Sequence, residues 1–316
     1  MPVSNSKSLG AIIVIALVGL GACGSDDERL AGTTTSVVAS ADSTSPATSN
    51  PANDNSVLVD AALATIGEGS TRFKVVIQVP ATEMGPASEV NAEGIVDFET
   101  GDASMSMDAG AAIAGLPAGV EIEPIELRMV DGNSYINMGV LLQAMVGLAG
   151  MSEALSDVEW VMMDPAAGSE GGIGTASANT WFHYQGYLLG ATQIVEVGPE
   201  EIDEVATTHF TAIAKPDAFE AVFADLKDSV PKIVASNLEA QMEFFVEDVP
   251  IDVWLDEDGR VVRFKYTVGE GSPPDGPPDG ADMMIDFFDY GVEVVIEIPD
   301  NAIDDSEFQE LMGTTP

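Results

Sequence analysis

RFKVVIQV at residues 72–79 decides the fold class. Apolar and polar side chains alternate along it, which is typical of a β-strand with one buried face and one wet face. The apolar face holds Phe73, Val75, Ile77 and Val79, and the polar face holds Arg72, Lys74 and Gln78. The same alternation recurs over 93–99 and 103–108, on either side of Thr100-Gly101-Asp102. These runs predict antiparallel strands joined by a tight turn.

Further strand pairs follow along the chain. They are expected at 125–130 with 134–137 around Asp131-Gly132-Asn133, at 193–197 with 205–215, at 251–256 with 260–268 around Glu257-Asp258-Gly259, and at 283–290 with 292–298, the last pair closing the sheet. A single strand is expected at 160–163. Strands outnumber helices and no βαβ pattern is visible, so the class is α+β with an antiparallel sheet.

Helices interrupt this sheet at four places. Helical spacing or composition predicts them at 57–66, ending before Gly67, at the apolar segment 140–155, at the aromatic segment 181–189, and at 217–247 with a break at Pro231. Loops rich in small residues or proline are expected at 109–124, 166–179 and 272–280.

The N-terminus carries a secretion signal. An apolar run at 9–20 follows Lys7 and is too short to cross a bilayer. It ends in Leu20-Gly21-Ala22-Cys23, which resembles the bacterial lipoprotein box, where the cysteine thiol receives a diacylglycerol. The alternative is an ordinary signal peptide whose end happens to hold the one cysteine of the chain. We therefore predict a protein anchored through Cys23 to the cell membrane, on its extracytoplasmic face.

Composition divides the rest of the chain. Residues 1–22 form the predicted signal peptide, and 23–55, rich in serine, threonine and alanine, form a flexible tether or a glycosylated stalk. Residues 56–300 hold enough apolar side chains for a folded domain, and 301–316 are expected to be a C-terminal tail.

Acidity is the outlying property of this chain. Its 11 lysines and arginines stand against 53 aspartates and glutamates, for a net charge of −42. Such a surface repels phosphate backbones and anionic headgroups, so no nucleic-acid partner is expected.

Three turn-centred stretches resemble a known family. They are VWLDEDGRV at 253–261, DGNSYI at 131–136 and DYGVEV at 289–294. With the order of elements and the lipoprotein box, they resemble the LppX/LprG-type lipoproteins of actinobacteria, relatives of the LolA/LolB lipoprotein carriers. The resemblance covers about 56–299. It implies a large curved sheet, a half-open barrel, with helices covering the concave face and an apolar cavity for acyl chains. The chain departs from the family in its acidity and its Pro-Asp-Gly loop.

A ligand site is expected between sheet and helices. The candidate lining residues are Val75, Ile77, Val96, Phe98, Met105, Met107, Leu127, Met129, Leu142 and Met145. Methionines adapt to varied chains because their torsions are soft. Two hypotheses remain open. In the first, the protein binds an acylated lipid or glycolipid and carries or presents it in the cell envelope. In the second, these residues fill a core, and the protein is a surface interaction or sensor module with an envelope protein partner.

Catalysis and metal binding have little support in the sequence. The chain has two histidines, His183 among aromatic residues and His209 on a strand where it is expected to face solvent. No Gly-x-Ser-x-Gly motif accompanies them. Aspartates around 256–258 and 275–282 do not match a calcium-binding loop. We therefore predict no enzyme, no cofactor and no metal.

Overall fold

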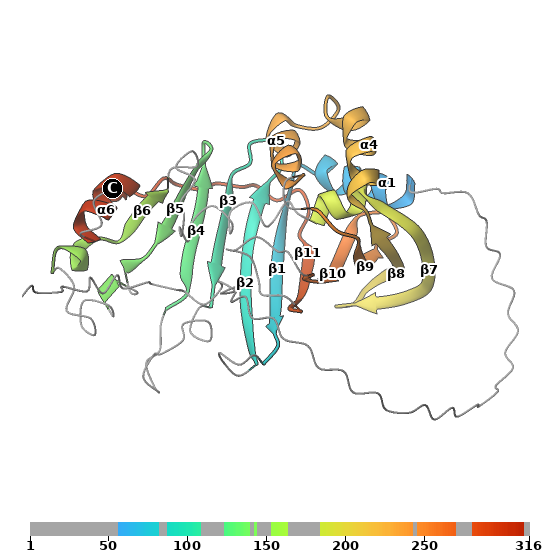
Figure 1. Ribbon diagram of the computed structural model, residues 1–316, viewed down its shortest axis with the longest axis horizontal. Coiled ribbons are helices and arrows are strands. Elements are labelled where there is room, and N and C mark those ends of the chain that lie inside the picture. The colour runs from blue at the N-terminus through green and yellow to red at the C-terminus, as the bar shows by residue number, and fades with distance from the viewer. Residues whose placement is uncertain are drawn as a thin grey trace, which may run out of the picture.

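Twelve strands form a single sheet in a computed structural model of the chain. The structure describes residues 56–81, 87–108, 123–139, 142–143, 153–163, 184–242, 245–269 and 280–312. Strand order is β12-β6-β5-β4-β3-β2-β1-β11-β10-β9-β8-β7. Neighbours pair antiparallel except β12 and β6, which pair parallel. The predicted α+β class is confirmed: the sheet is open and largely antiparallel, and helices pack against it (Figure 1).

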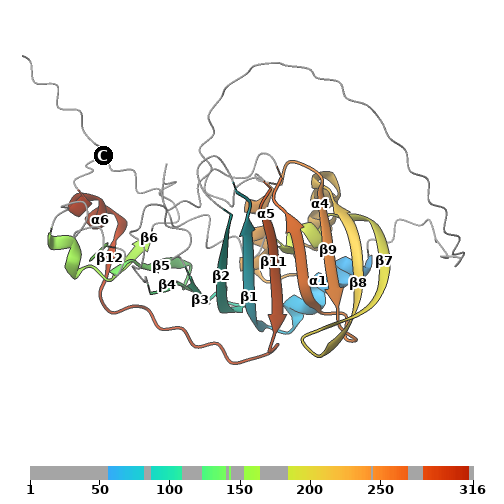
Figure 2. The ribbon, with the colours of Figure 1, turned by 90° about the horizontal axis from the view of Figure 1, so that it is seen from below.

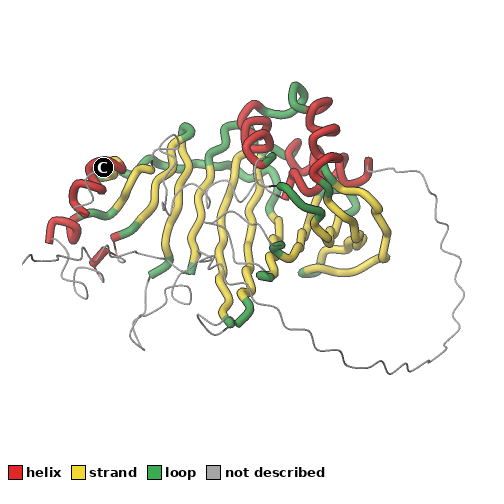
Figure 3. The backbone as a smooth tube through the Cα atoms, viewed as in Figure 1, coloured by secondary structure: helices red, strands yellow, loops and turns green. Residues whose placement is uncertain are grey.

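The strands are β1 (Ser70–Val79), β2 (Ser88–Asp97), β3 (Ala103–Met107), β4 (Ile125–Val130), β5 (Asn133–Asn137), β6 (Trp160–Met163), β7 (Ala191–Ile202), β8 (Val205–Ala214), β9 (Val249–Leu255), β10 (Val261–Thr267), β11 (Asp282–Phe288) and β12 (Ala302–Asp304). The helices are α1 (Ser56–Gly67), α4 (Pro216–Leu226), α5 (Lys232–Gln241) and α6 (Asp305–Met312), with a 3₁₀ turn η1 (Glu153–Asp157). Residues 184–189 are also helical. Figure 3 shows how strands dominate the chain.

Tight turns with left-handed backbone angles fix the hairpins. Asp131 and Gly132 have φ of 53° and 78°, and Asp203 and Glu204 have φ of 48° and 70°. Two successive positive φ values match the right-handed twist of the flanking strands, so β4–β5 and β7–β8 close with the shortest loops. Pro231 breaks the predicted helical segment 217–247 into α4 and α5, as expected.

One face of the sheet is apolar and carries the core. Residues in register across the strands, such as Phe287, Phe73, Met105 and Leu127, are all buried on this face. In Figure 2, α1 lies across the half of the sheet that holds β8 to β11 and contacts β10, while α4 and α5 lie at one end of the same half. The opposite, outer face presents the polar members of each alternating strand.

The C-terminal part of the sequence prediction is wrong. Residues 292–298 pair with none of the described strands; β11 ends at Phe288, and the chain then crosses the sheet to β12 as an extended strap, residues 289–301 (Figure 2). Asp289 and Gly291, with φ of 51° and 69°, turn the chain past the start of β1, where the Gly291 N–H donates to the Ser70 carbonyl at 2.9 Å. The Oγ atom of Ser70 donates a hydrogen bond of 2.5 Å to the carbonyl of Val292 and fixes the start of the strap.

Contacts with the outer face fix the far half of the strap. Ile296 packs on a small cluster of Val130, Tyr135 and Trp160. The Arg128 guanidinium donates to the carbonyl of Glu297 at 3.1 Å and lies 4.6 Å from the Trp160 ring centroid. Beyond the expected domain end at residue 300, β12 adds to the sheet beside β6, and α6 follows it.

Candidate functional site

The predicted lining residues gather in one hydrophobic cluster. Val75, Val96, Phe98, Met105, Met107, Leu127 and Leu142 are buried in it, and Ile77 and Met129 pack against it half-buried. Strands β1 to β4 supply most of them, so the sheet register brings together side chains from four separate stretches of sequence. The tenth, Met145, lies outside the described residues, as do Cys23, the tether and most of 140–155.

An aromatic layer extends this cluster under the helical residues 184–189. The Tyr184 ring lies 4.7 Å from Phe287, and the Tyr187 ring lies 5.0 Å from Tyr266 and 4.9 Å from Phe245, measured between centroids. Burial raises the pKa of Tyr187 to about 12 and that of Tyr184 further, so both rings stay neutral at physiological pH. The predicted aromatic helix is thus present where it is described.

Gln185 places a polar group inside this apolar layer. Its side chain is fully buried; Nε2 donates to the Tyr184 hydroxyl at 3.3 Å, whereas Oε1 has no hydrogen-bond partner among the described residues. A buried carbonyl oxygen without a donor costs free energy, about 1–3 kcal/mol. The sequence did not single out this residue, because one glutamine in an aromatic segment carries no local sign of burial.

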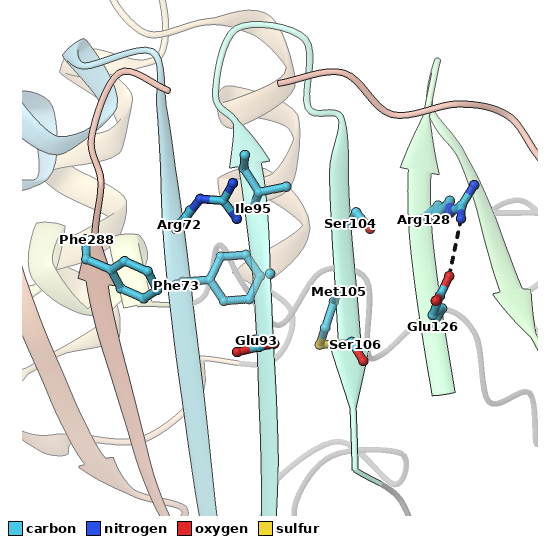
Figure 4. A pocket seen from close by; sticks show the side chains of 11 residues that line it. Arg72, Phe73, Glu93, Ile95, Ser104, Met105, Ser106, Glu126, Arg128 and Phe288 are labelled. Carbon is cyan, nitrogen blue, oxygen red and sulfur yellow. Dashed lines mark hydrogen bonds and ion pairs between the residues drawn. The ribbon is translucent and has the colours of Figure 1, made fainter. Parts of the chain in front are cut away.

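A second site, a groove of about 420 Å³, lies on the outer face over β1 to β4 and the end of β11 (Figure 4). Two rows of residues in register form it. The first row runs Phe288, Arg72, Ile95, Ser104 and Arg128, and the second runs Glu93, Ser106 and Glu126. Sequence reasoning missed this groove because its residues come together only through the strand register.

Gly94 gives the groove its floor. The side of this residue that faces the core is occupied by the Phe73 ring, and a Cβ atom there would lie 2.5 Å from Phe73 Cζ and 2.4 Å from the Ser104 carbonyl oxygen. Phe73 and Met105 therefore reach the groove from the core side of the sheet.

Charges in the groove are balanced and only partly paired. Arg128 donates to Glu126 at 3.3 Å, and Arg72 lies 3.8 Å from Asp289 with both side chains more than half exposed. The side chains of Glu93, Ser104 and Ser106 make no hydrogen bond or ion pair with any described residue.

His209 lies elsewhere on the outer face, and the expectation that it faces solvent is wrong. Its side chain is only 12% exposed and stacks on Trp254 with 4.2 Å between centroids. Nδ1 lies 3.1 Å from Glu200 and Nε2 lies 2.8 Å from Asp252, while Trp254 Nε1 donates to Glu200 at 2.8 Å. Alternation placed His209 on the polar face correctly, but a neighbouring tryptophan covers it there.

No protein-family model matches the sequence, and no curated protein matches it significantly. Among solved structures, lipoprotein LppX of Mycobacterium tuberculosis matches with 12% identity and a TM-score of 0.39, covering 77% of this chain and 99% of that one. LprF of Mycobacterium bovis matches with 14% identity and a TM-score of 0.40, covering 78% and 96%.

A LolA superfamily protein of Nitrosomonas europaea is similar at 9% identity, with a TM-score of 0.27 and coverage of 79% of this chain and 96% of that chain. These similarities to LppX and to a LolA superfamily protein agree with the resemblance noted in the sequence.

Metal-binding groups and membrane-spanning helices are both absent from the described residues. Within them, no group of three or more histidine, cysteine, aspartate or glutamate side chains is placed to hold a metal ion. No helix in the same ranges combines the length and apolar character that a membrane span needs.

Proposed function

We propose that the protein is a lipoprotein, anchored through acylated Cys23, that binds an acylated lipid between sheet and helices and carries or presents it in the cell envelope. The observation that carries this proposal is the buried Gln185 amide. Its oxygen, which has no hydrogen-bond partner among the described residues, lies among apolar and aromatic side chains. Apolar walls with a few placed polar groups are the general form of a small-molecule site.

The ligand that fits is amphiphilic. Each CH₂ group buried from water contributes about 0.8 kcal/mol, so one acyl chain supplies useful affinity. A hydroxyl or amide N–H near its polar end would donate to Gln185 Oε1 and satisfy the buried acceptor. The methionines Met105, Met107 and Met129 give the wall beside β3 and β4 the adaptability that chains of different length require.

A displacement assay tests this proposal. Delipidated mature chain, residues 23–316 with Cys23→Ser, is loaded with N-phenyl-1-naphthylamine, a neutral probe that fluoresces in apolar surroundings. We expect monopalmitin, which carries hydroxyl donors, to displace the probe at lower concentration than methyl palmitate, which carries none. Gln185→Met should abolish this preference while leaving the probe bound. Equal displacement by both lipids in the parent protein would contradict the role of Gln185.

A bulky substitution separates an open site from a filled core. Met129→Trp should block the probe at little cost in stability if the space beside it is open. In a filled core the same change overpacks the site and costs about 1–3 kcal/mol. Met284→Trp, on the outer face of β11, is the matched control and should leave probe binding intact.

A further inference from the structure

We propose that the outer-face groove binds a neutral saccharide. The groove lies over β1 to β4 on the side of the sheet opposite the apolar cluster, so this inference does not depend on the proposed function. Its volume of about 420 Å³ falls within the range of about 300–1,000 Å³ that is usual for small-molecule sites.

The groove is long and narrow, which is the shape that a short chain of sugar rings would fill. Neighbouring strands lie about 4.8 Å apart, so the row from Phe288 on β11 to Arg128 on β4 spans about 19 Å. The second row, with Glu93 and Glu126, lies two residues further along the strands, about 7 Å away. The groove is therefore long across the strands and narrow along them.

The groove is lined by hydrogen-bond donors and by hydrogen-bond acceptors that are not used in contacts with other described residues. Arg72 uses only Nε in its 3.8 Å contact with Asp289, which leaves the two terminal nitrogens of its planar guanidinium for a ligand. Glu93 offers a carboxylate, and the Ser104 and Ser106 hydroxyls can both donate and accept. A polyhydroxyl ligand matches this mixture because each of its hydroxyls also donates and accepts.

Apolar surface lies between these polar groups. Phe288 is 43% exposed and Ile95 is half-buried, and both line the groove beside Arg72 (Figure 4). A sugar ring presents C–H groups on its faces and hydroxyls around its edge. It can therefore lie on Phe288 and Ile95 while its hydroxyls reach the flanking polar groups.

Charge decides the ligand class. A free anion is repelled by a chain of net charge −42, and it would compete with the carboxylates already beside Arg72 and Arg128. A cation is repelled by the guanidiniums of Arg72 and Arg128. With two arginines and two glutamates lining it, the groove is locally neutral, and only an uncharged ligand escapes both repulsions.

Saturation-transfer NMR on the mature chain, residues 23–316 with Cys23→Ser, tests this assignment with maltotriose, cellotriose and mannotriose as probes. We expect at least one to bind, with an affinity that is the same at 50 mM and 500 mM NaCl. Arg72→Gln should weaken binding about tenfold or more, which is the loss of one or two hydrogen bonds. Lys265→Gln removes the same charge from the outer face on β10, outside the groove, and should leave binding unchanged.

Glu93 distinguishes a saccharide site from an anion site. For a saccharide, Glu93→Gln keeps an acceptor and changes affinity by less than about threefold, whereas Glu93→Leu removes it and weakens binding about tenfold. For an anion such as citrate, Glu93→Gln removes a repelling carboxylate and should tighten binding. Citrate binding that Glu93→Gln tightens and salt weakens would overturn the proposal.

Two sources of saccharide can be separated in the same series. Binding of a soluble trisaccharide identifies a free glycan. Binding only to phosphatidylcholine vesicles that carry a dihexosyl diacylglycerol, and not to plain vesicles, identifies a glycolipid headgroup. Both results uphold the site if Arg72→Gln weakens the binding about tenfold or more. No binding in either arm, or binding that Arg72→Gln leaves unchanged, overturns it.

Discussion

At the scale of single residues, the packing of His209 and Trp254 and the lack of a side chain at Gly94 explain local features of the sheet. Gly94 leaves room for the Phe73 ring, His209 bridges β7 and β9 through Glu200 and Asp252, and Trp254 covers it. None of these roles is visible in the alternation of the strands. Alternation assigns a residue to a face, but only the register decides which neighbour it meets.

Gly94→Ala should destabilise the protein by about 1–3 kcal/mol, because the added methyl group collides with the Phe73 ring and the Ser104 carbonyl. Gly67→Ala is the matched control: no atom lies within 4 Å of its Cβ position at the end of α1. Urea unfolding of both variants checks the difference. Equal stability of the two would contradict the close packing at Gly94.

The carboxylate of Glu200 makes stability depend on pH. Its pKa lies below the ordinary value, first because Trp254 donates a hydrogen bond to it and then because His209 is near. A lowered folded-state pKa stabilises the fold above the unfolded-state pKa, about 4.3, and the contribution is lost as pH falls through the folded-state pKa.

The cost of Glu200→Gln should therefore be largest near pH 7 and shrink below about pH 4. Comparing each variant with the parent at the same pH cancels the titration of the other carboxylates. Glu201→Gln, an exposed neighbour on β7 that makes no hydrogen bond or ion pair with a described residue, should cost nothing at either pH. A Glu200→Gln penalty that stays constant from pH 7 to pH 3 would refute the linkage.

At the scale of elements, the sequence predicted eleven of the twelve strands, although β2 and β7 begin earlier than expected, and it missed β12. The strap shows the limit of this reasoning. Val292, Val294 and Ile296 alternate in burial as a strand would, but their backbone has no strand beside it. An extended segment that packs by side chains alone has the same sequence pattern as a paired one, so the sequence could not separate them.

Arg128 should hold the strap in place, since it bonds the Glu297 carbonyl and stacks on Trp160. We expect Arg128→Met to speed proteolytic cleavage within 289–301 several-fold, because local opening exposes the segment. Lys74→Met, on the outer face of β1 and away from the strap contacts, serves as control. Cleavage of both variants at the parental rate would show that Arg128 does not hold the strap.

At the scale of the whole molecule, the two faces of the sheet carry different features. The helix-covered face gathers nine of the ten predicted lining residues, and the outer face carries the groove and the strap. The sequence predicted which residues meet on the apolar face because burial follows the strand period. It could not predict Gln185 or the groove, which depend on helix placement and on register between distant strands.

Native mass spectrometry of the mature chain, purified from a bacterial host as residues 23–316 with Cys23→Ser, tests the central claim most directly. The account predicts an added mass equal to one acylated lipid, which leaves when the protein is denatured and returns when monopalmitin is added to the refolded chain. A bare protein mass that stays bare after monopalmitin and phospholipid are added would contradict it, and would indicate an interaction module with a filled core instead.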